Sequence, residues 1–461
     1  MFSRIYKGLF DTGRQVHIAP LVVFRMVFGL TMFGAIIRFW SNGWIKSLYI
    51  DPEYYFPYLG FEWIKPLGDP GMYVVFALMA LATLFIAFGL FFRISSLTFC
   101  LLFTYVELID KTPYLNHYYF ICIVSFLLFL LPAHRFFSLD VKFGFVKPVT
   151  HVPRWIPGTI KLQLGLVYFF AGVAKMHPDW LFHAQPLKIW LPARADMPVL
   201  GPLFAQEWVA YLFSWVGLIF DLIIPLVLLN NKWRPVGYIF VVVFHVLTYM
   251  LFNIGMFPFV MIGCTLIFFS PAFHINVITT IARVLRKPAY SGSNSALNTF
   301  KPSYRIIRGF LVIYFVIQVL VPMRYLMYPG NLFWTEQGFR FSWRVMLMEK
   351  SGTCTFYVCD KSRKQAIEIN NREYLTPFQE KMMSTQPDMI LQFAHHLHDV
   401  YKDSVILIKE QKFEFKDPKI YVDSYVSLNG RGSQRFIDPE VNLAMETPSL
   451  KNKTWIMPFE E

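Results

Sequence analysis

Residues 71–92 have the sequence GMYVVFALMALATLFIAFGLFF, an apolar stretch without a single charged side chain. A helix rises about 1.5 Å per residue and the hydrocarbon core of a bilayer is about 30 Å thick, so a spanning helix needs about 17–25 mostly apolar residues. This stretch therefore predicts a transmembrane helix.

Stretches of the same kind recur up to residue 323. We count nine candidate spans, which lie near residues 20–40, 71–92, 94–110, 117–133, 157–175, 207–229, 234–252, 256–271 and 305–323. The third, fourth and eighth are short, which predicts tilted, broken or partly re-entrant helices. Over the 461 residues, 55% are hydrophobic and 16% charged, which excludes intrinsic disorder and disfavours a single soluble domain.

The net charge of +13 has a topological explanation. With the N-terminus in the cytoplasm, the segments on that side of nine spans carry 17 Lys and Arg residues, whereas the opposite loops carry 7. This asymmetry agrees with the positive-inside rule, and an even number of spans would not produce it. The basic charge therefore needs no nucleic-acid partner, and we expect the C-terminus on the non-cytoplasmic side.

The composition changes after the ninth span. Charges become frequent, and short alternating apolar runs that begin near Cys354 and Lys419 are typical of half-buried strands. Residues 377–401 have apolar side chains at helical spacing. We predict an all-α membrane bundle of about nine transmembrane helices over residues 1–323, followed by a soluble, β-rich α+β domain over residues 324–461.

Two polar sites lie at span ends on the non-cytoplasmic side, where ionisable groups are costly and mark functional candidates. Asn116 and His117 begin the fourth span after Pro113; the structural alternative is a polar turn in which Asn116 caps the next helix. Lys175 ends the fifth span after Gly172, which permits close approach of a neighbouring helix.

Lys175 has two interpretations. It could snorkel to the interface as a structural lysine. Alternatively, desolvation disfavours the ammonium form, and a neutral amine is a competent general base. The predicted topology places Lys175 on the same side as His117.

Other polar features are less specific. His245, in the seventh span, is more often a hydrogen-bonded structural residue in such a setting, while Gly255 and Pro258 after it predict irregular backbone that is buried or lines a cavity. Arg-rich segments at 338–350 and 427–436 suit capture of carboxylates, with a solvated surface as the alternative.

The cysteines and histidines indicate neither a disulfide scaffold nor a metal centre. The five cysteines form no CxxC, although Cys354 and Cys359 could pair in an oxidising compartment. His395, His396 and His398 lack a carboxylate or cysteine at useful spacing, so we expect no metal.

Several short motifs occur in a distinctive order. They include LIDKT with NH at 108–117, YFFAGV with K and DW at 168–180, GMFP at 255–258, SW at 342–343, and QRF with DP at 434–439. On these motifs the chain resembles the vitamin K-dependent gamma-glutamyl carboxylases, within the group of horizontally transferred transmembrane domain (HTTM) proteins. The resemblance covers more than 400 residues and implies a bacterial-type enzyme, with its C-terminal domain in the periplasm.

The resemblance implies a reaction and its base. In that family, vitamin K hydroquinone, of the menaquinone or phylloquinone type, reacts with O2 and becomes the 2,3-epoxide. A strong base forms during this oxygenation and removes a γ-proton from a glutamate side chain. The resulting carbanion captures CO2, which places the enzyme in the carbon–carbon lyase class. The resemblance implies that Lys175 deprotonates the hydroquinone and that His117, beside Asn116, assists proton handling.

The resemblance also implies two sets of binding residues. Those for the cofactor are Met256, Phe257, Pro258 and Met346, and those for a glutamate-containing peptide or protein are Lys350, Arg431, Gln434 and Arg435.

Two alternatives stay open. The chain has Met348 and Lys350 where the animal enzymes carry a histidine and an arginine. Lys350 keeps the positive charge of the arginine but lacks its planar guanidinium group. A hydroquinone epoxidase that carboxylates no glutamate is therefore the first alternative. A membrane transporter or lipid-binding module is the second, although we find no inverted sequence repeat.

Overall fold

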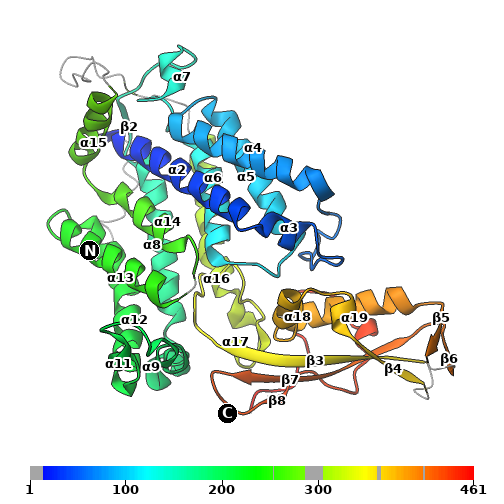
Figure 1. Ribbon diagram of the computed structural model, residues 1–461. Coiled ribbons are helices and arrows are strands. Elements are labelled where there is room, and N and C mark those ends of the chain that lie inside the picture. The colour runs from blue at the N-terminus through cyan, green and yellow to red at the C-terminus, as the bar shows by residue number, and fades with distance from the viewer. Residues whose placement is uncertain are drawn as a thin grey trace.

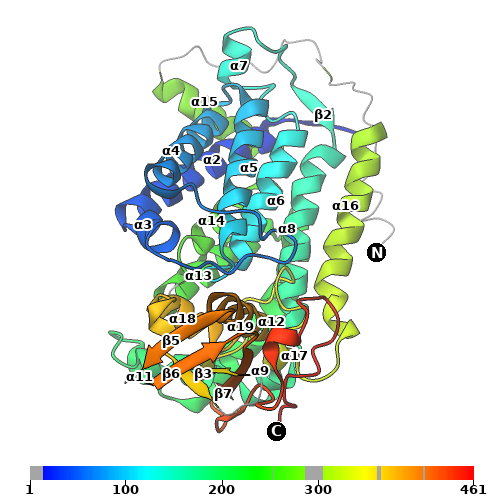
Figure 2. The ribbon, with the colours of Figure 1, turned by 90° about the vertical axis from the view of Figure 1, so that its right-hand side faces the viewer.

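The computed structural model describes residues 14–252, 254–285, 299, 305–360, 365–408 and 411–460. A helical bundle forms one part, and a sheet with its own helices lies at one end of this bundle (Figures 1 and 2). The bundle elements are β1 (Gln15–His17), α2 (Ala19–Ser41), α3 (Trp44–Tyr49), α4 (Gly68–Phe88), α5 (Phe92–Ile109), α6 (Asn116–Leu130), α7 (Leu139–Lys142), β2 (His151–Pro153), α8 (Trp155–Ala174), α9 (Pro178–His183), α10 (Leu187–Trp190), η1 (Pro192–Arg194), α11 (Gly201–Phe204), α12 (Glu207–Leu229), α13 (Arg234–Leu251), α14 (Phe257–Thr265), η2 (Leu266–Phe268), α15 (Pro271–Val284) and α16 (Arg305–Met323).

Each of the nine predicted spans contains a helix. In the described part of the chain, seven helices are long and apolar enough to cross a membrane: α2, α4, α5, α8, α12, α13 and α16. The fourth predicted span, α6, has 15 residues, and the eighth, α14 with η2, meets α15 at a bend of 115°. Short and broken helices are therefore found where the sequence predicted them, except that α5 is a regular helix of 18 residues.

The C-terminal part is β-rich, as predicted. Its elements are η3 (Arg324–Met327), α17 (Leu332–Thr335), β3 (Lys350–Cys359), β4 (Ala366–Ile369), η4 (Asn371–Glu373), α18 (Pro377–Met383), α19 (Pro387–Tyr401), β5 (Ser404–Ile408), β6 (Gln411–Phe415), β7 (Lys419–Leu428), β8 (Gln434–Arg435) and η5 (Leu443–Met445). The main sheet is antiparallel with the order β4-β3-β7-β8, and β5 pairs with β6. Helices α18 and α19 pack on the main sheet (Figure 1).

The geometry of β3 excludes a disulfide between Cys354 and Cys359. Both thiols are free, and they lie on this one strand. Five residues of extended strand separate their Cα atoms by about 16 Å, whereas a disulfide needs less than about 7 Å.

A partly buried charge cluster, in which Lys111 is the buried member, joins the sheet part to the bundle. Asp388, in the first turn of α19, lies 2.7 Å from Lys111 Nζ, in the loop after α5, and 2.7 Å from Arg340 Nη1. Burial lowers the pKa of Lys111 to about 8, with Asp388 opposing this shift. Burial alone would raise the pKa of Asp388, but Arg340 and Lys111 outweigh it and hold that pKa well below its usual range. Lys111, in the polar loop before α6, therefore contributes to the contact between the bundle and the sheet part.

We predict that Asp388→Ala destabilises the protein strongly. The substitution leaves Lys111 and Arg340 buried without their counter-charge, which typically costs about 3–5 kcal/mol. The measurement is the thermal unfolding midpoint of the purified protein in detergent.

Asp51→Ala is the matched control, because its ion pair with Lys46 is exposed to solvent and should contribute little. Since the folded-state pKa of Asp388 is depressed, its contribution is present above the ordinary carboxyl pKa of about 4 and is lost as the pH falls below it. Equal midpoints for Asp388→Ala and Asp51→Ala at neutral pH would contradict this account.

Candidate functional site

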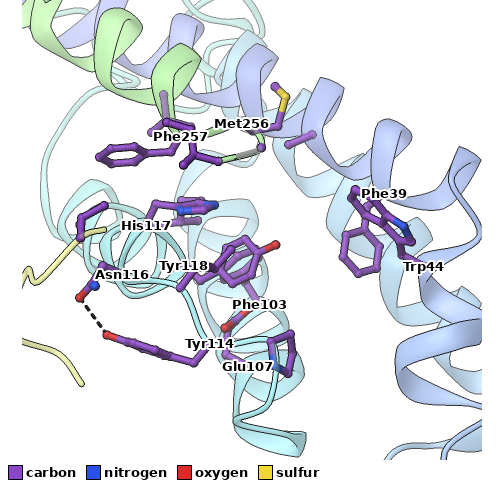
Figure 3. Close-up of a pocket in the computed structure, with 18 of the residues that line it drawn as sticks. Phe39, Trp44, Phe103, Glu107, Tyr114, Asn116, His117, Tyr118, Met256 and Phe257 are labelled. Carbon is purple, nitrogen blue, oxygen red and sulfur yellow. Dashed lines mark hydrogen bonds between the residues drawn. The ribbon is translucent and has the colours of Figure 1, made fainter. Parts of the chain in front are cut away.

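A cavity of about 890 Å³ lies inside the bundle, next to the sheet part. Side chains of α2, α3, α4, α5, α6, α13 and α14 line it, together with residues 344–348 of the segment that leads into β3 (Figure 3). Its lining is mainly aromatic and aliphatic, with a few polar groups, and its volume is in the usual range for small-molecule sites.

Five of the residues predicted for catalysis or cofactor binding line this cavity: Asn116, His117, Met256, Phe257 and Met346. Pro258 does not. It lies in the first turn of α14, where a missing backbone N–H costs nothing, and Gly255 before it turns the chain with a φ of +61°. These two residues shape the backbone that carries Met256 and Phe257 into the cavity.

His117 and Asn116 begin α6 but have different surroundings. The His117 ring is buried, with its centroid 5.6 Å from that of Phe257, and it makes no hydrogen bond to another described residue. Asn116 is not the helix cap, since Leu115 holds that position. Its amide donates to the carbonyl of Arg344 at 2.7 Å and accepts from the Tyr114 hydroxyl at 3.1 Å, so it ties α6 to the segment before β3.

Lys175 does not snorkel to the interface. Its side chain is 8% exposed, and its amine lies 2.7 Å from the Asp221 carboxylate on α12. Asp221 is a partner that our sequence analysis missed, although an acid within an apolar span is itself a functional signal. Gly172 brings the two helices together, because a Cβ there would lie 2.7 Å from Leu222 Cδ2.

Lys175 and Asp221 line a second, smaller cavity of about 100 Å³. Tyr168 and His245 lie on the same wall, joined by a hydrogen bond of 3.0 Å, which agrees with a structural role for His245. The sequence predicted Lys175 and His117 on the same side of the membrane, and the structure places them in two different cavities.

The two cavities are neighbours that share part of their walls. The shared residues are Phe252, Ile254, Phe257, Val345 and Met346. The Phe257 ring lies between two imidazoles, with centroid distances of 5.6 Å to His117 and 5.7 Å to His245. Phe257 is therefore the partition between the Lys175 side and the His117 side.

Neither cavity includes the four residues predicted to bind substrate. Lys350 donates to Glu336 Oε1 and to the carbonyls of Trp334 and Thr385, so its amine is engaged within the protein.

The other three contact different partners. Arg431 binds both oxygens of Asp179, Gln434 exchanges two hydrogen bonds with the backbone of Glu460, and Arg435 donates to the Tyr425 hydroxyl. Burial would raise the pKa of Asp179, but hydrogen bonds from Arg431 and Asn429 lower it overall. Arg431 thus joins the sheet part to α9 of the bundle.

The described residues contain no group of three or more His, Cys, Asp or Glu side chains arranged to hold a metal ion. His395 contacts the backbone carbonyls of Leu443 and Glu446, and the ring of His396 packs on Tyr54.

Comparisons with known families match both parts of the chain. Residues 13–273 match the HTTM domain, and residues 303–461 match the lumenal domain of vitamin K-dependent gamma-carboxylase. No solved structure matches the chain.

We predict that Gly172→Ala disturbs the Lys175–Asp221 pair. The new methyl group would collide with Leu222, the neighbour of Asp221, and overpacking of this kind costs about 1–3 kcal/mol. We expect a lower thermal unfolding midpoint and lower activity in the assay described below.

Gly165→Ala, on the same helix, is the control, since its nearest new contact would be an ordinary 3.9 Å. If both variants behave alike, the close approach at Gly172 has no special role.

Proposed function

The chain belongs to the HTTM family and carries the lumenal domain of vitamin K-dependent gamma-carboxylases, and from this premise we propose that it is a multi-pass membrane enzyme with two reactions. It converts vitamin K hydroquinone to its epoxide, and it carboxylates glutamate side chains of a peptide or protein with CO2. The observation that carries the proposal is the large apolar cavity with His117 on its wall, directly beside the buried Lys175–Asp221 pair.

The residues of the cavity fit an apolar quinone. Its walls are mainly aromatic and aliphatic, and the His117 ring has no hydrogen-bond partner among the described residues, so it is available to a ring oxygen. Met256, Phe257 and Met346 would pack on the ring system. When bound, reduced vitamin K supplies, through its reaction with O2, a base stronger than any side chain.

We propose that Lys175 accepts the first proton from a ring hydroxyl, in the form of the pair in which the amine is neutral and the Asp221 carboxyl group holds the shared proton. Asp221 holds the amine in place at 2.7 Å, and the apolar surroundings exclude water that would compete for the proton. Because Phe257 and Met346 form the shared wall, a rotation of these side chains would join the two cavities and bring a ring held beside His117 within reach of Lys175.

The proposed orientation has the N-terminus in the cytoplasm and the lumenal-type domain on the opposite side, which is the periplasm if the protein is bacterial. The charge asymmetry of the loops supports this orientation. The loop after α5, α9 and the sheet part lie at one end of the bundle, while α7, β2 and α15 lie at the other (Figures 1 and 2). An apolar quinone would enter from the membrane and a peptide from the aqueous side.

Epoxidation without glutamate carboxylation is the second candidate. The observation in its favour is that Lys350 and Arg431, which we expected to contact the glutamate, are engaged with Glu336 and Asp179.

We predict that Lys175→Ala abolishes epoxide formation from vitamin K hydroquinone. Loss of a general base typically reduces the rate by about 10²–10⁴-fold. The measurement is chromatographic detection of the epoxide made by purified protein in detergent. Because Lys175→Ala leaves Asp221 buried without a partner, Lys175→Ala/Asp221→Ala should be equally inactive but more stable than the single variant.

Lys188→Ala is the matched lysine control, since Lys188 pairs with Glu207 near the surface. Full epoxidation by Lys175→Ala would refute the assignment of the base. Adding a Glu-containing peptide and labelled bicarbonate then separates the two candidates: label in the peptide supports the carboxylase, whereas epoxide without label supports the second candidate.

A further inference from the structure

Glu107 is an acidic residue inside the large cavity that the proposed reaction does not use. It lies on α5, next to Val106 and one turn from Phe103, and both of these also line the cavity. Figure 3 shows its carboxyl group near Phe103 and Tyr118, on the wall formed by α5 and α6.

The carboxyl group of Glu107 lacks a strong partner in the protein. In the part of the chain that the structure describes, it makes neither a hydrogen bond nor an ion pair; it interacts electrostatically with the side chains of Tyr49, Tyr58, Tyr118 and Cys122. Arg38 also lines the cavity, but its guanidinium packs over the Trp44 ring at 4.9 Å.

A polar group kept from water without a partner costs free energy, which a ligand recovers if it supplies the missing hydrogen bond. A carboxyl group offers an oxygen that accepts a hydrogen bond, so a hydroxyl group of a ligand can satisfy it. His117, which makes no hydrogen bond to another described residue, lines the same cavity from the adjacent helix α6. The cavity therefore presents these two groups, beside the hydroxyl groups of Tyr49 and Tyr118, to one apolar ligand.

We propose that Glu107 accepts a hydrogen bond from a hydroxyl group of a 1,4-dihydroxy aromatic ligand whose other oxygen faces His117. This inference rests on the proposed function for the identity of the cavity as a quinone site. The reduced ring offers two hydroxyl donors, whereas a diether of the same ring offers none.

Binding of two matched probes tests the proposal without turnover. The probes are 2-methyl-1,4-naphthohydroquinone, kept under anaerobic conditions, and its 1,4-dimethyl ether, which has the same ring but no donor. Affinity is measured by quenching of tryptophan fluorescence, since Trp44 lies on the cavity wall. We expect the wild-type protein to prefer the hydroquinone by about 10-fold, the upper end of the usual effect of one hydrogen bond.

Glu107→Leu should remove this preference by weakening hydroquinone binding about 10-fold while leaving ether binding nearly unchanged. Glu107→Gln, which is nearly isosteric, should keep the preference, because its amide oxygen accepts the same hydrogen bond. Met79→Leu, an apolar exchange on the same cavity wall, is the control and should keep the full preference.

The outcomes separate this inference from the proposed function. An undiminished preference in Glu107→Leu, or equal binding of the two probes by the wild-type protein, overturns the role of Glu107 and leaves the quinone site standing. Binding of neither probe by the wild-type protein overturns the quinone site itself, and the role of Glu107 with it.

Discussion

The contact between Lys175 and Asp221 is the interaction on which the arrangement of the site depends. Two ionisable groups inside an apolar bundle are stable only if they satisfy one another, because each alone would carry a large desolvation cost. Lys175 follows α8 and Asp221 lies on α12, and Gly172 allows these two helices to approach closely because it presents no side chain to Leu222. The glycine, the ion pair and the smaller cavity are thus consequences of one helix–helix contact.

The large cavity depends on a different constraint, since the sheet part supplies some of its wall. The segment before β3 reaches into the bundle, where Trp343 is buried and stacks on Tyr119, and Met346 separates the two cavities. Phe341, Trp343 and Met346 have positive φ values of 60°, 60° and 55°, which side chains adopt only when the surroundings compel them. Changes in the sheet part can therefore reach the cavity through this segment.

Three contacts hold the two parts in this relation. Asp388 binds Lys111 and Arg340, Asp179 binds Arg431, and Asn116 binds the Arg344 carbonyl. Each joins residues that lie far apart in the sequence; the first two compensate charges in a poorly solvated interface, and the third satisfies a backbone carbonyl. Residues that resemble substrate ligands in the sequence, such as Arg431, are in this structure part of the scaffold that positions the site.

The sequence by itself determined the helical membrane part, the β-rich C-terminal part and the candidate status of Lys175 and His117. Hydrophobic length, alternation and the cost of ionisable groups near a membrane are local properties, so they can be recognised without a fold. Only the tertiary structure decided that Lys175 faces Asp221, that Phe257 separates it from His117, and that Glu107 enters the cavity. These relations depend on how helices distant in sequence pack against one another, and local periodicity contains no information about which faces will meet.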